Sequence, residues 1–374
     1  MNVRGAAKLL VTDPREFARR VPPALDWRWR SAWSPIGRSD TRRAIDGAAV
    51  WAARSLRRRP EAGGRPLTLR FANAQLSRLP ELEWFAEEVA DASSGALRIS
   101  FVNNWTTADN PLEETATIKG VMGNHADLGW AGTRAFGCLG VRSLDPLQTP
   151  FLLENYRALD AVCRDDVATE MLEPLTRLGL AGLVVLPGAQ RKPFAFARRL
   201  LGPRDYEGAK LRIHESLVAE SAYRALGAEA VTLSVKQMAS RADALVDGLD
   251  VQTEALAGWG LRGSITFNVN LWPRTIAIVA SRRTLEWLGK AEREALGVAA
   301  SRTLVRALDH LTDQEQRDLD ALPPTVTAIY ADDEQVAALR QRLEPVREEL
   351  RADPATGPFL ERLETIVAGV GAAA

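Results

Sequence analysis

Histidine and cysteine, the side chains that most often bind metals or act as nucleophiles, are scarce in this sequence. The three histidines, His125, His214 and His310, lie far apart, and no two of them have the spacing of metal ligands on one helix. Cys138 and Cys163 are too few and too distant in sequence for a disulfide framework or a structural zinc site, and we expect both to be buried apolar side chains. The sequence therefore predicts no metal site and no resident cofactor.

Carboxylates occur as neighbouring pairs, of which Glu113 and Glu114 are typical. Adjacent residues of a helix point about 100° apart, so we interpret these pairs as solvated helix faces and not as acid–base dyads. The sequence also lacks a phosphate-binding Gly-x-x-x-x-Gly-Lys loop, a Gly-x-Gly-x-x-Gly turn and a Gly-x-Ser-x-Gly elbow. Nucleotide binding and covalent catalysis are not indicated, and an enzyme stays open only because one fold hosts many activities.

Positive charge is concentrated at the start of the chain. The 48 Lys and Arg balance the 48 Asp and Glu over 374 residues, but residues 1–66 hold 15 basic and 6 acidic side chains, a net charge of +9. Four of the ten tryptophans also lie in this Arg- and Trp-rich extension. Such segments contact nucleic acid or anionic membranes, or have no partner. Because this one matches no nucleic-acid module, we do not expect nucleic-acid binding.

Neither a membrane span nor a secretory signal is evident. The longest nearly apolar stretch, residues 178–187, is about half the length that a bilayer requires. Near the N-terminus, Arg4 and Lys8 are followed by Asp13, Pro14 and further charged residues instead of the apolar centre of a signal. As written, we expect the chain not to be addressed for export.

Short strands and amphipathic helices alternate from residue 67 onward, which predicts an α/β fold with right-handed crossovers and mainly parallel pairing. The expected strands are residues 67–72, 97–103, 127–130, 182–186, 210–214, 230–233, 247–252, 265–270 and 275–280. The expected helices are residues 79–92, 113–121, 153–162, 165–178 and 217–226, and after residue 283 the chain is expected to be mainly helical over 284–308, from 312, over 333–350 and over 358–370.

Several short landmarks follow one another in the order and spacing typical of one family. They are Ala-Glu-Glu-Val-Ala-Asp-Ala-Ser-Ser-Gly at 86–95, Gly120 with Asp-Leu-Gly at 127–129, Pro-Phe-Leu at 150–152, Tyr-Glu-Gly-Ala-Lys-Leu-Arg-Ile at 206–213, Leu-Gly-Ala at 226–228 and Leu-Val-Asp-Gly-Leu-Asp at 245–250. Together they resemble the solute-binding proteins of TRAP transporters, an extracytoplasmic family that captures carboxylates for a secondary membrane carrier. The resemblance covers roughly residues 67–300 and leaves residues 1–66 outside it.

The resemblance implies a two-lobed fold of the periplasmic-binding-protein kind, similar to its type II, with a hinge, a long helix spanning both lobes and a helical C-terminus. We expect residues 67–188 with about 277–316 to form the first lobe, and residues 189–276 with about 317–374 to form the second. Residues 1–66 are then an N-terminal extension and linker.

The resemblance also implies where a ligand binds. In the family an Arg at the end of the Gly-x-Lys-x-Arg strand holds the ligand carboxylate, and Arg212 occupies that position; a planar guanidinium matches the two carboxylate oxygens. A second family arginine corresponds to Arg191, which in this arginine-rich chain could equally be a surface residue. Where the family carries Glu and then often Asn, this chain has Asp250 and Val251, so either Gln252 compensates or the ligand differs.

Polar and aromatic side chains of the first lobe follow strands at the end where open α/β sheets receive ligands. These candidates are Asn73 and Gln75 after the first strand, Trp105 after the second and Trp130 at the end of the third, each with an ordinary loop or core role as the alternative. Asp247, by contrast, is expected to stabilise a turn with Gly248.

Two functions from different classes follow from these observations. The resemblance implies a non-enzymatic, extracytoplasmic solute-binding component of a TRAP-type transporter, whose partners are a small organic acid, such as a dicarboxylate, and the membrane permease subunits. The alternative hypothesis is a cytoplasmic ligand-sensing regulator whose basic segment, residues 1–66, contacts nucleic acid. The missing signal favours the alternative, and the family landmarks favour the first hypothesis.

Overall fold

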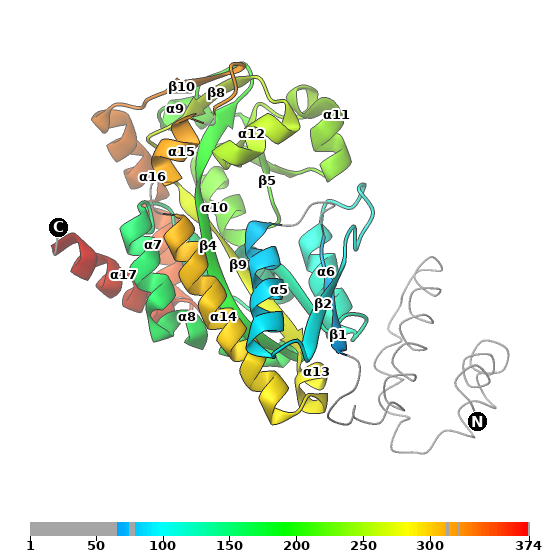
Figure 1. Ribbon diagram of the computed structural model, residues 1–374. Coiled ribbons are helices and arrows are strands. Elements are labelled where there is room, and N and C mark those ends of the chain that lie inside the picture. The colour runs from blue at the N-terminus through cyan, green and yellow to red at the C-terminus, as the bar shows by residue number, and fades with distance from the viewer. Residues whose placement is uncertain (1–65, 75–78, 312–313, 321, 373–374) are drawn as a thin grey trace, which may run out of the picture.

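The computed structural model describes residues 66–372 except 75–78, 312–313 and 321 (Figure 1). The predictions for residues 1–66, and for Gln75, therefore lie outside the described residues, apart from Pro66. Helices and strands alternate over the described part, so the predicted α/β class is confirmed.

The first part of the sheet is parallel, as predicted. Strand β1 (Leu67–Ala72) lies between β2 (Leu97–Val102) and β3 (Leu128–Gly132) and runs parallel to both. Because strand side chains alternate between faces, Leu69 and Phe71 pack with α5 (Pro80–Ala92) and α14 (Lys290–His310), while Ala72 packs with α6 (Glu113–Met122). The carboxyl ends of β1 and β3 therefore lead towards the same edge of the sheet.

Two long strands continue the sheet with antiparallel pairing. Strand β9 (Trp272–Ser281) is antiparallel to β3, and β4 (Leu180–Ala195) is antiparallel to β9. The prediction of a short strand at 182–186 with parallel pairing was wrong here. Pro187, Gly188 and the polar residues after them resemble a loop in the sequence, but a register shift between Pro187 and Gln190 lets the strand continue.

The second part of the sheet continues from the far end of β4. The sheet order is β2-β1-β3-β9-β4-β7-β5-β6, in which β5 (Lys210–Ile213) runs parallel to β6 (Glu229–Thr232) and β7 (Gly248–Val251). Strand β8 (Gly263–Thr266) pairs with both β4 and β10 (Val326–Ile329). Thus β4 is the strand that both parts of the sheet share.

Helices cover both parts of the sheet. Around the first part lie α7 (Tyr156–Arg164), α8 (Asp166–Glu170), α13 (Arg282–Trp287) and the 3-10 helices η2 (Thr133–Leu139), η3 (Asp145–Gln148) and η4 (Glu173–Leu178); around the second lie α9 (Pro203–Tyr206), α10 (Leu217–Ala225), α11 (Val235–Leu245), α12 (Thr253–Trp259) and α15 (Gln314–Asp320). Helix α14 packs against α5 and β4, and it runs beside that shared strand in Figure 1.

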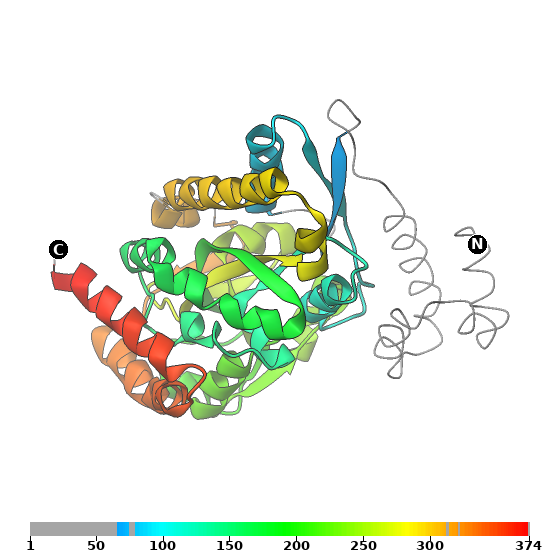
Figure 2. The same ribbon diagram turned by 90° about the horizontal axis from the view of Figure 1, so that it is seen from below.

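The second half of the chain departs from the prediction at α11, at β10 and at the helix expected over 284–308. The helix expected over 284–308 is two helices, α13 and α14, separated at Leu288 and Gly289. Strand β10 and helix α11 were not predicted, because β10 has only four residues and α11 is interrupted by the non-helical backbone of Arg241. Helix α16 (Asp333–Ala352) packs on α10, whereas α17 (Gly357–Ala372) packs on α7 and α8 and ends at the molecular periphery (Figure 2).

Candidate functional site

Arg191 and Asp250 form a buried ion pair where β4 meets β7. Arg191 Nη1 donates to Asp250 Oδ2 at 2.9 Å and to the Asp250 carbonyl at 3.2 Å, and Trp272 Nε1 donates to the same carboxylate at 3.3 Å. Burial lowers the pKa of Arg191, while Asp250 opposes that change. Arg191 is thus not a surface residue, and its charge is compensated inside the protein.

A second buried pair was not predicted. Arg134, in η2 just after β3, donates from Nη2 to Glu114 Oε1 at 2.7 Å, and Glu114 Oε2 accepts the Gly132 N–H at 2.6 Å. Burial raises the pKa of Glu114, but Arg134 and the Gly132 N–H together lower it by more, so the pKa lies below its ordinary value. Glu114 is only 4% exposed, which corrects the interpretation of Glu113 and Glu114 as a solvated pair.

Arg212, on β5, has no such carboxylate. Its side chain is buried; Nη2 lies 3.4 Å from His214 Nδ1, and neither Nε nor Nη1 has a hydrogen-bond partner among the described residues. Burial lowers the pKa of Arg212 to about 10, with Asp250 raising it and Arg191 and Arg134 lowering it. Since a buried guanidinium normally has its donors paired, Arg212 is the group here best suited to an anion.

His214 is uncharged beside Arg212. Burial lowers its pKa well below the ordinary value, and Arg212, Arg134 and Arg191 lower it further. The ring of Trp259 lies on another side of Arg212, with its centroid 5.7 Å from the guanidinium carbon. The surroundings of Arg212 are therefore aromatic and uncharged on these two sides.

Two more carboxylates lie at the N-terminus of α6. Glu215, directly after β5 and His214, accepts the Thr115 N–H at 2.7 Å and the Thr115 hydroxyl at 2.5 Å. Burial raises the pKa of Glu215, and Thr115 partly opposes this. Burial, followed by the charge of Glu114, raises the pKa of half-buried Glu113 to about 7, against the influence of Arg212.

Further contacts join the same two parts of the fold. The Lys236 N–H of α11 donates to the Ala108 carbonyl at 3.1 Å, and its ammonium lies 3.0 Å from Asp109 Oδ1. Both acceptors lie in the segment between β2 and α6. Together with the pair of Glu215 and Thr115, these contacts connect the two carboxyl-end edges of the sheet.

The aromatic candidates of the first sheet gather separately. Trp130 Nε1 donates to Asn73 Oδ1 at 2.8 Å, and Asn73 Nδ2 donates to Asn103 Oδ1 at 3.0 Å. Asn73 and Trp130 are almost fully buried, and the Trp105 N–H donates to the Asn73 carbonyl at 3.0 Å. The Trp105 ring lies so close to Gly120 that an added Cβ there would overlap it. These residues connect the ends of β1, β2 and β3.

Gln252 lines a cavity of about 300 Å³ together with Arg274, whose guanidinium pairs with Glu81, and with residues of α14 and α15. Arg212 does not line this cavity. Strand β7 ends at Val251, which is buried in an apolar cluster. Asp247 has a structural contact other than the expected turn with Gly248, because its carboxylate accepts the Lys210 N–H at the start of β5 at 2.8 Å.

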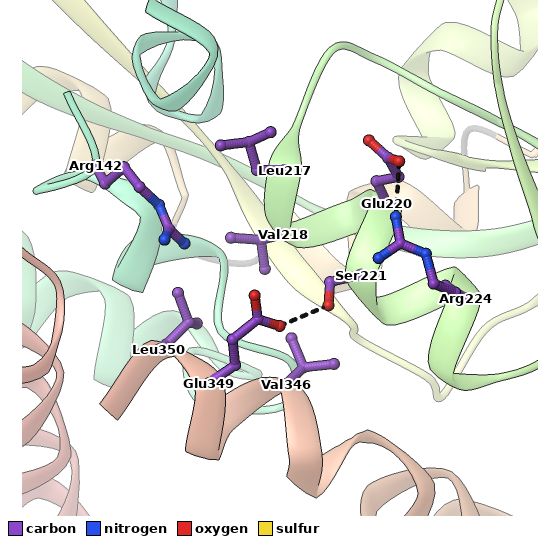
Figure 3. A pocket seen from close by; sticks show the side chains of 9 residues that line it. All are labelled: Arg142, Leu217, Val218, Glu220, Ser221, Arg224, Val346, Glu349 and Leu350. Carbon is purple, nitrogen blue, oxygen red and sulfur yellow. Dashed lines mark hydrogen bonds and ion pairs between the residues drawn. The ribbon is translucent and has the colours of Figure 1, made fainter. Parts of the chain in front are cut away.

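A further cavity, of about 240 Å³, lies between α10 and α16 (Figure 3). It is lined by Arg142, Val218, Ser221, Glu349 and other residues of these helices, and Ser221 donates to Glu349 at 2.8 Å. None of the predicted site residues lines it. We interpret it as a packing gap beneath the C-terminal helix α16.

Within 66–372, excluding the gaps, no group of three or more His, Cys, Asp and Glu side chains could hold a metal ion. Over the same residues, no helix combines the length and apolarity that crossing a membrane would require. Cys163 is buried as predicted, but Cys138 is exposed, because it lies at the end of η2 and faces away from the core.

Comparison with known proteins identifies the family. The profile of DctP, the bacterial extracellular solute-binding protein family 7, matches residues 75–353. The chain belongs to this family. Membership of family 7 confirms the resemblance seen in the sequence and supports a solute-binding protein over a cytoplasmic regulator.

Family 7 relatives differ considerably from this chain in sequence. The C4-dicarboxylate-binding periplasmic protein DctP of Rhodobacter capsulatus is 28% identical over 190 residues, which are 50% of this chain and 56% of that protein. The chain thus matches about half the length of this relative.

Solved structures share the fold. The sugar acid binding protein DctPAm of Advenella mimigardefordensis, in complex with galactonate, has a TM-score of 0.71 at 20% identity and covers 82% of this chain and 99% of its own. A TRAP periplasmic solute binding protein of Ralstonia eutropha H16 with bound (S)-2-acetolactate has a TM-score of 0.69 at 19% identity, covering 81% and 99%.

Proposed function

We propose that this chain is the solute-binding component of a TRAP-type transporter and that it binds the carboxylate of an organic acid on Arg212. The main support is that the buried guanidinium of Arg212 has no partner for Nε and Nη1 among the described residues, whereas Arg134 and Arg191 already have carboxylate partners. A ligand carboxylate would supply the acceptors that these donors lack. The galactonate and acetolactate bound by the two solved relatives are acids of the expected kind.

The arrangement of strands supports binding by hinge closure. We propose lobes of residues 67–188 with about 277–316 and of residues 189–276 with about 317–374, because β4 runs from one part of the sheet to the other. Helix α17 belongs to the second range but packs on α7 and α8 of the first. The register shift between Pro187 and Gln190 is a natural place for bending. Closure would bring Glu215 to Thr115 and Lys236 to Asp109, and ligand binding would favour that state.

The remaining candidates have supporting roles in this proposal. Arg191, held by Asp250, fixes the floor beside Arg212, and Asn73, Trp130 and Trp105 shape the facing edge. No bond of the ligand changes, so the protein acts as a receptor and not as an enzyme. Its partners would be the acid and the TRAP membrane permease, and its place would be outside the cytoplasm, in line with the family's extracellular description.

The test is a thermal-shift and calorimetry screen of the full chain against mono- and dicarboxylates, sugar acids, keto acids and neutral sugars. A ligand of the native state raises the melting temperature, so an acid-specific shift is expected. Arg212→Ala should weaken binding about 100-fold or more, because a charge-assisted pair is lost. Arg224→Ala, at an exposed arginine that pairs with Glu220, is the control. Unchanged affinity in Arg212→Ala, or no shift with any acid, would refute the proposal.

A further inference from the structure

The cavity lined by Gln252 and Arg274 is a second place where buried polar atoms gather without partners. Its volume of about 300 Å³ is at the lower end of the range for small-molecule sites. Its walls come from the start of α5, from Gly188 in the register shift of β4, from β9, from the start of α12, from the end of α14 and from α15. Because neither Arg212 nor its neighbours His214 and Trp259 line it, the cavity is separate from the proposed carboxylate site.

Three side chains that line this cavity are buried or nearly so and have polar atoms without a partner. Glu81 Oε1 accepts from Arg274 Nη2, but Glu81 Oε2 and the Nε and Nη1 atoms of Arg274 have no hydrogen-bond partner among the described residues. Asp318 Oδ1 accepts from Gln314 Nε2 at 2.8 Å, and Asp318 Oδ2 has no such partner. Glu81 is 5% exposed and Asp318 1%. Since buried polar atoms are normally hydrogen-bonded, these four atoms indicate that the cavity has a polar occupant.

The unpartnered atoms are of two complementary kinds. Arg274 offers guanidinium N–H donors, which suit a carboxylate, whereas Glu81 and Asp318 offer carboxylate oxygens, which suit an ammonium group. The charged side chains of the lining leave one carboxylate in excess: they are Glu81, Glu254, Asp318, Arg274 and Arg317. A simple anion would increase that excess, and a simple cation would leave the donors of Arg274 without acceptors.

A molecule with both a carboxylate and an ammonium group matches both kinds of atom and brings no net charge into a buried site. We propose that this cavity binds a small amino acid in its zwitterionic form, with the carboxylate on Arg274 and the ammonium group on Asp318. Glu81 Oε2 is then a further acceptor for the ammonium group. The rest of the wall is largely apolar and suits a short side chain; it includes Leu79, Pro80, Ala189, Ala307 and Leu311.

The test is calorimetry and thermal shift of the full chain with L-alanine, L-serine and L-valine at neutral pH. The amino acid that binds is compared with the analogues that lack one of its two charged groups, which for alanine are propionate and ethylamine. Each analogue should bind about tenfold more weakly or worse, because it leaves one kind of buried atom unpaired.

A pair of variants on α15 tests the position of the ammonium group. Asp318→Asn keeps an oxygen for Gln314 but removes the charge, and it should weaken amino-acid binding about tenfold or more. Asp320→Asn is the matched control, because exposed Asp320 accepts from Gln316 Nε2 at the same distance of 2.8 Å. It should leave the affinity unchanged.

The outcomes separate this cavity from the site at Arg212. Amino-acid binding that persists in Arg212→Ala and is weakened in Asp318→Asn supports the inference, whether or not an organic acid binds at Arg212. Binding that Asp318→Asn leaves unchanged, or that Arg212→Ala abolishes, would place the amino acid elsewhere and overturn the inference. If the folded chain binds none of the three amino acids at millimolar concentration, the cavity holds water only and the inference fails, while the proposed function is judged by the acid screen alone.

Discussion

Glu215, which follows β5 in the second part of the sheet, caps helix α6 on the first part. Its substitution is therefore the most informative test of the proposed closure of the two lobes. Helix α6 begins after Leu112, which offers no side-chain cap, so the Thr115 N–H in the first turn depends on an outside acceptor. Glu215 supplies it, with 100 residues of chain between the two partners. Glu215→Ala would leave the Thr115 N–H and hydroxyl buried without this acceptor.

The expected loss follows from the two hydrogen bonds. Hydrogen bonds to a charged group contribute about 1.5–3 kcal/mol each. Burial of the carboxylate, evident in its raised pKa, offsets part of this sum, so a net loss of about 2–3 kcal/mol is reasonable. Because about 1.4 kcal/mol corresponds to a factor of ten, Glu215→Ala should weaken ligand binding roughly 30- to 140-fold if the contact forms on closure. Glu215→Gln keeps an acceptor and should lose less.

Calorimetric Kd values, together with melting of the ligand-free protein, provide the assay. If Glu215 acts through Thr115, a double-mutant cycle of Glu215→Ala with Thr115→Val will show coupling, because both substitutions remove the same hydroxyl contact. Glu220→Ala, which removes an exposed partner of Arg224, is the matched control. A Kd within twofold of wild type with unchanged melting, or additive effects in the cycle, would refute the capping argument.

Two further predictions concern the buried charges. The pKa of Glu113 is raised to about 7 from an ordinary 4.5, so the described state holds this proton more tightly than a solvated carboxyl does, and Glu215 acts in the same direction. The affinity for the organic acid should therefore fall as pH rises from 5 to 8. Calorimetry at four pH values checks this: Glu113→Gln should flatten the profile, and a wild-type affinity that rises with pH would contradict the prediction. Asp250→Ala leaves Arg191 buried without its carboxylate partner and should lower the free energy of unfolding by about 3–5 kcal/mol in urea titration. Asp160→Ala, at an exposed pair with Arg164, should change it by less than about 1 kcal/mol. Equal effects of the two substitutions would show that the buried ion pair contributes no more to stability than the exposed one.

Local patterns were enough for most elements of the fold. Strand β1 was predicted at its observed bounds, and α5, β5 and α10 were predicted to within a residue or so, because alternation and helical periodicity are properties of contiguous residues. The length of strand β4 was underestimated, because its second half depends on contacts with residues far away in the sequence. Lys192 is charged yet 1% exposed, since its ammonium donates to the Phe267 carbonyl and to Asn270 Oδ1, partners some 75 residues away in sequence.

Residues of the candidate site could be predicted where they belong to a sequence motif of the family, but not where they are defined by an ion pair between residues far apart in the chain. Arg212 and Arg191 were named from landmarks of the family, and the structure places them near one another. Arg134 has no such landmark, although its position just after β3, at the end of the sheet that receives ligands, is a signal that could have found it. The place of Gln252 could not be predicted from the alternation of the strand, because β7 ends at Val251.

Two of the three buried arginines have carboxylate partners and the third has none, and this difference bears on how the proposed site would select its ligand. Three uncompensated guanidinium groups this close would repel one another and would attract any small anion, inorganic ones included. Glu114 and Asp250 remove that general attraction and at the same time fix Arg134 and Arg191 in place by hydrogen bonds. In the proposed site, only Arg212 would gain a partner when the ligand binds, so the gain in binding energy would depend on one carboxylate at one position. On the proposed function, selectivity would therefore arise from the two arginines that the protein has already neutralised as much as from Arg212, which it has not.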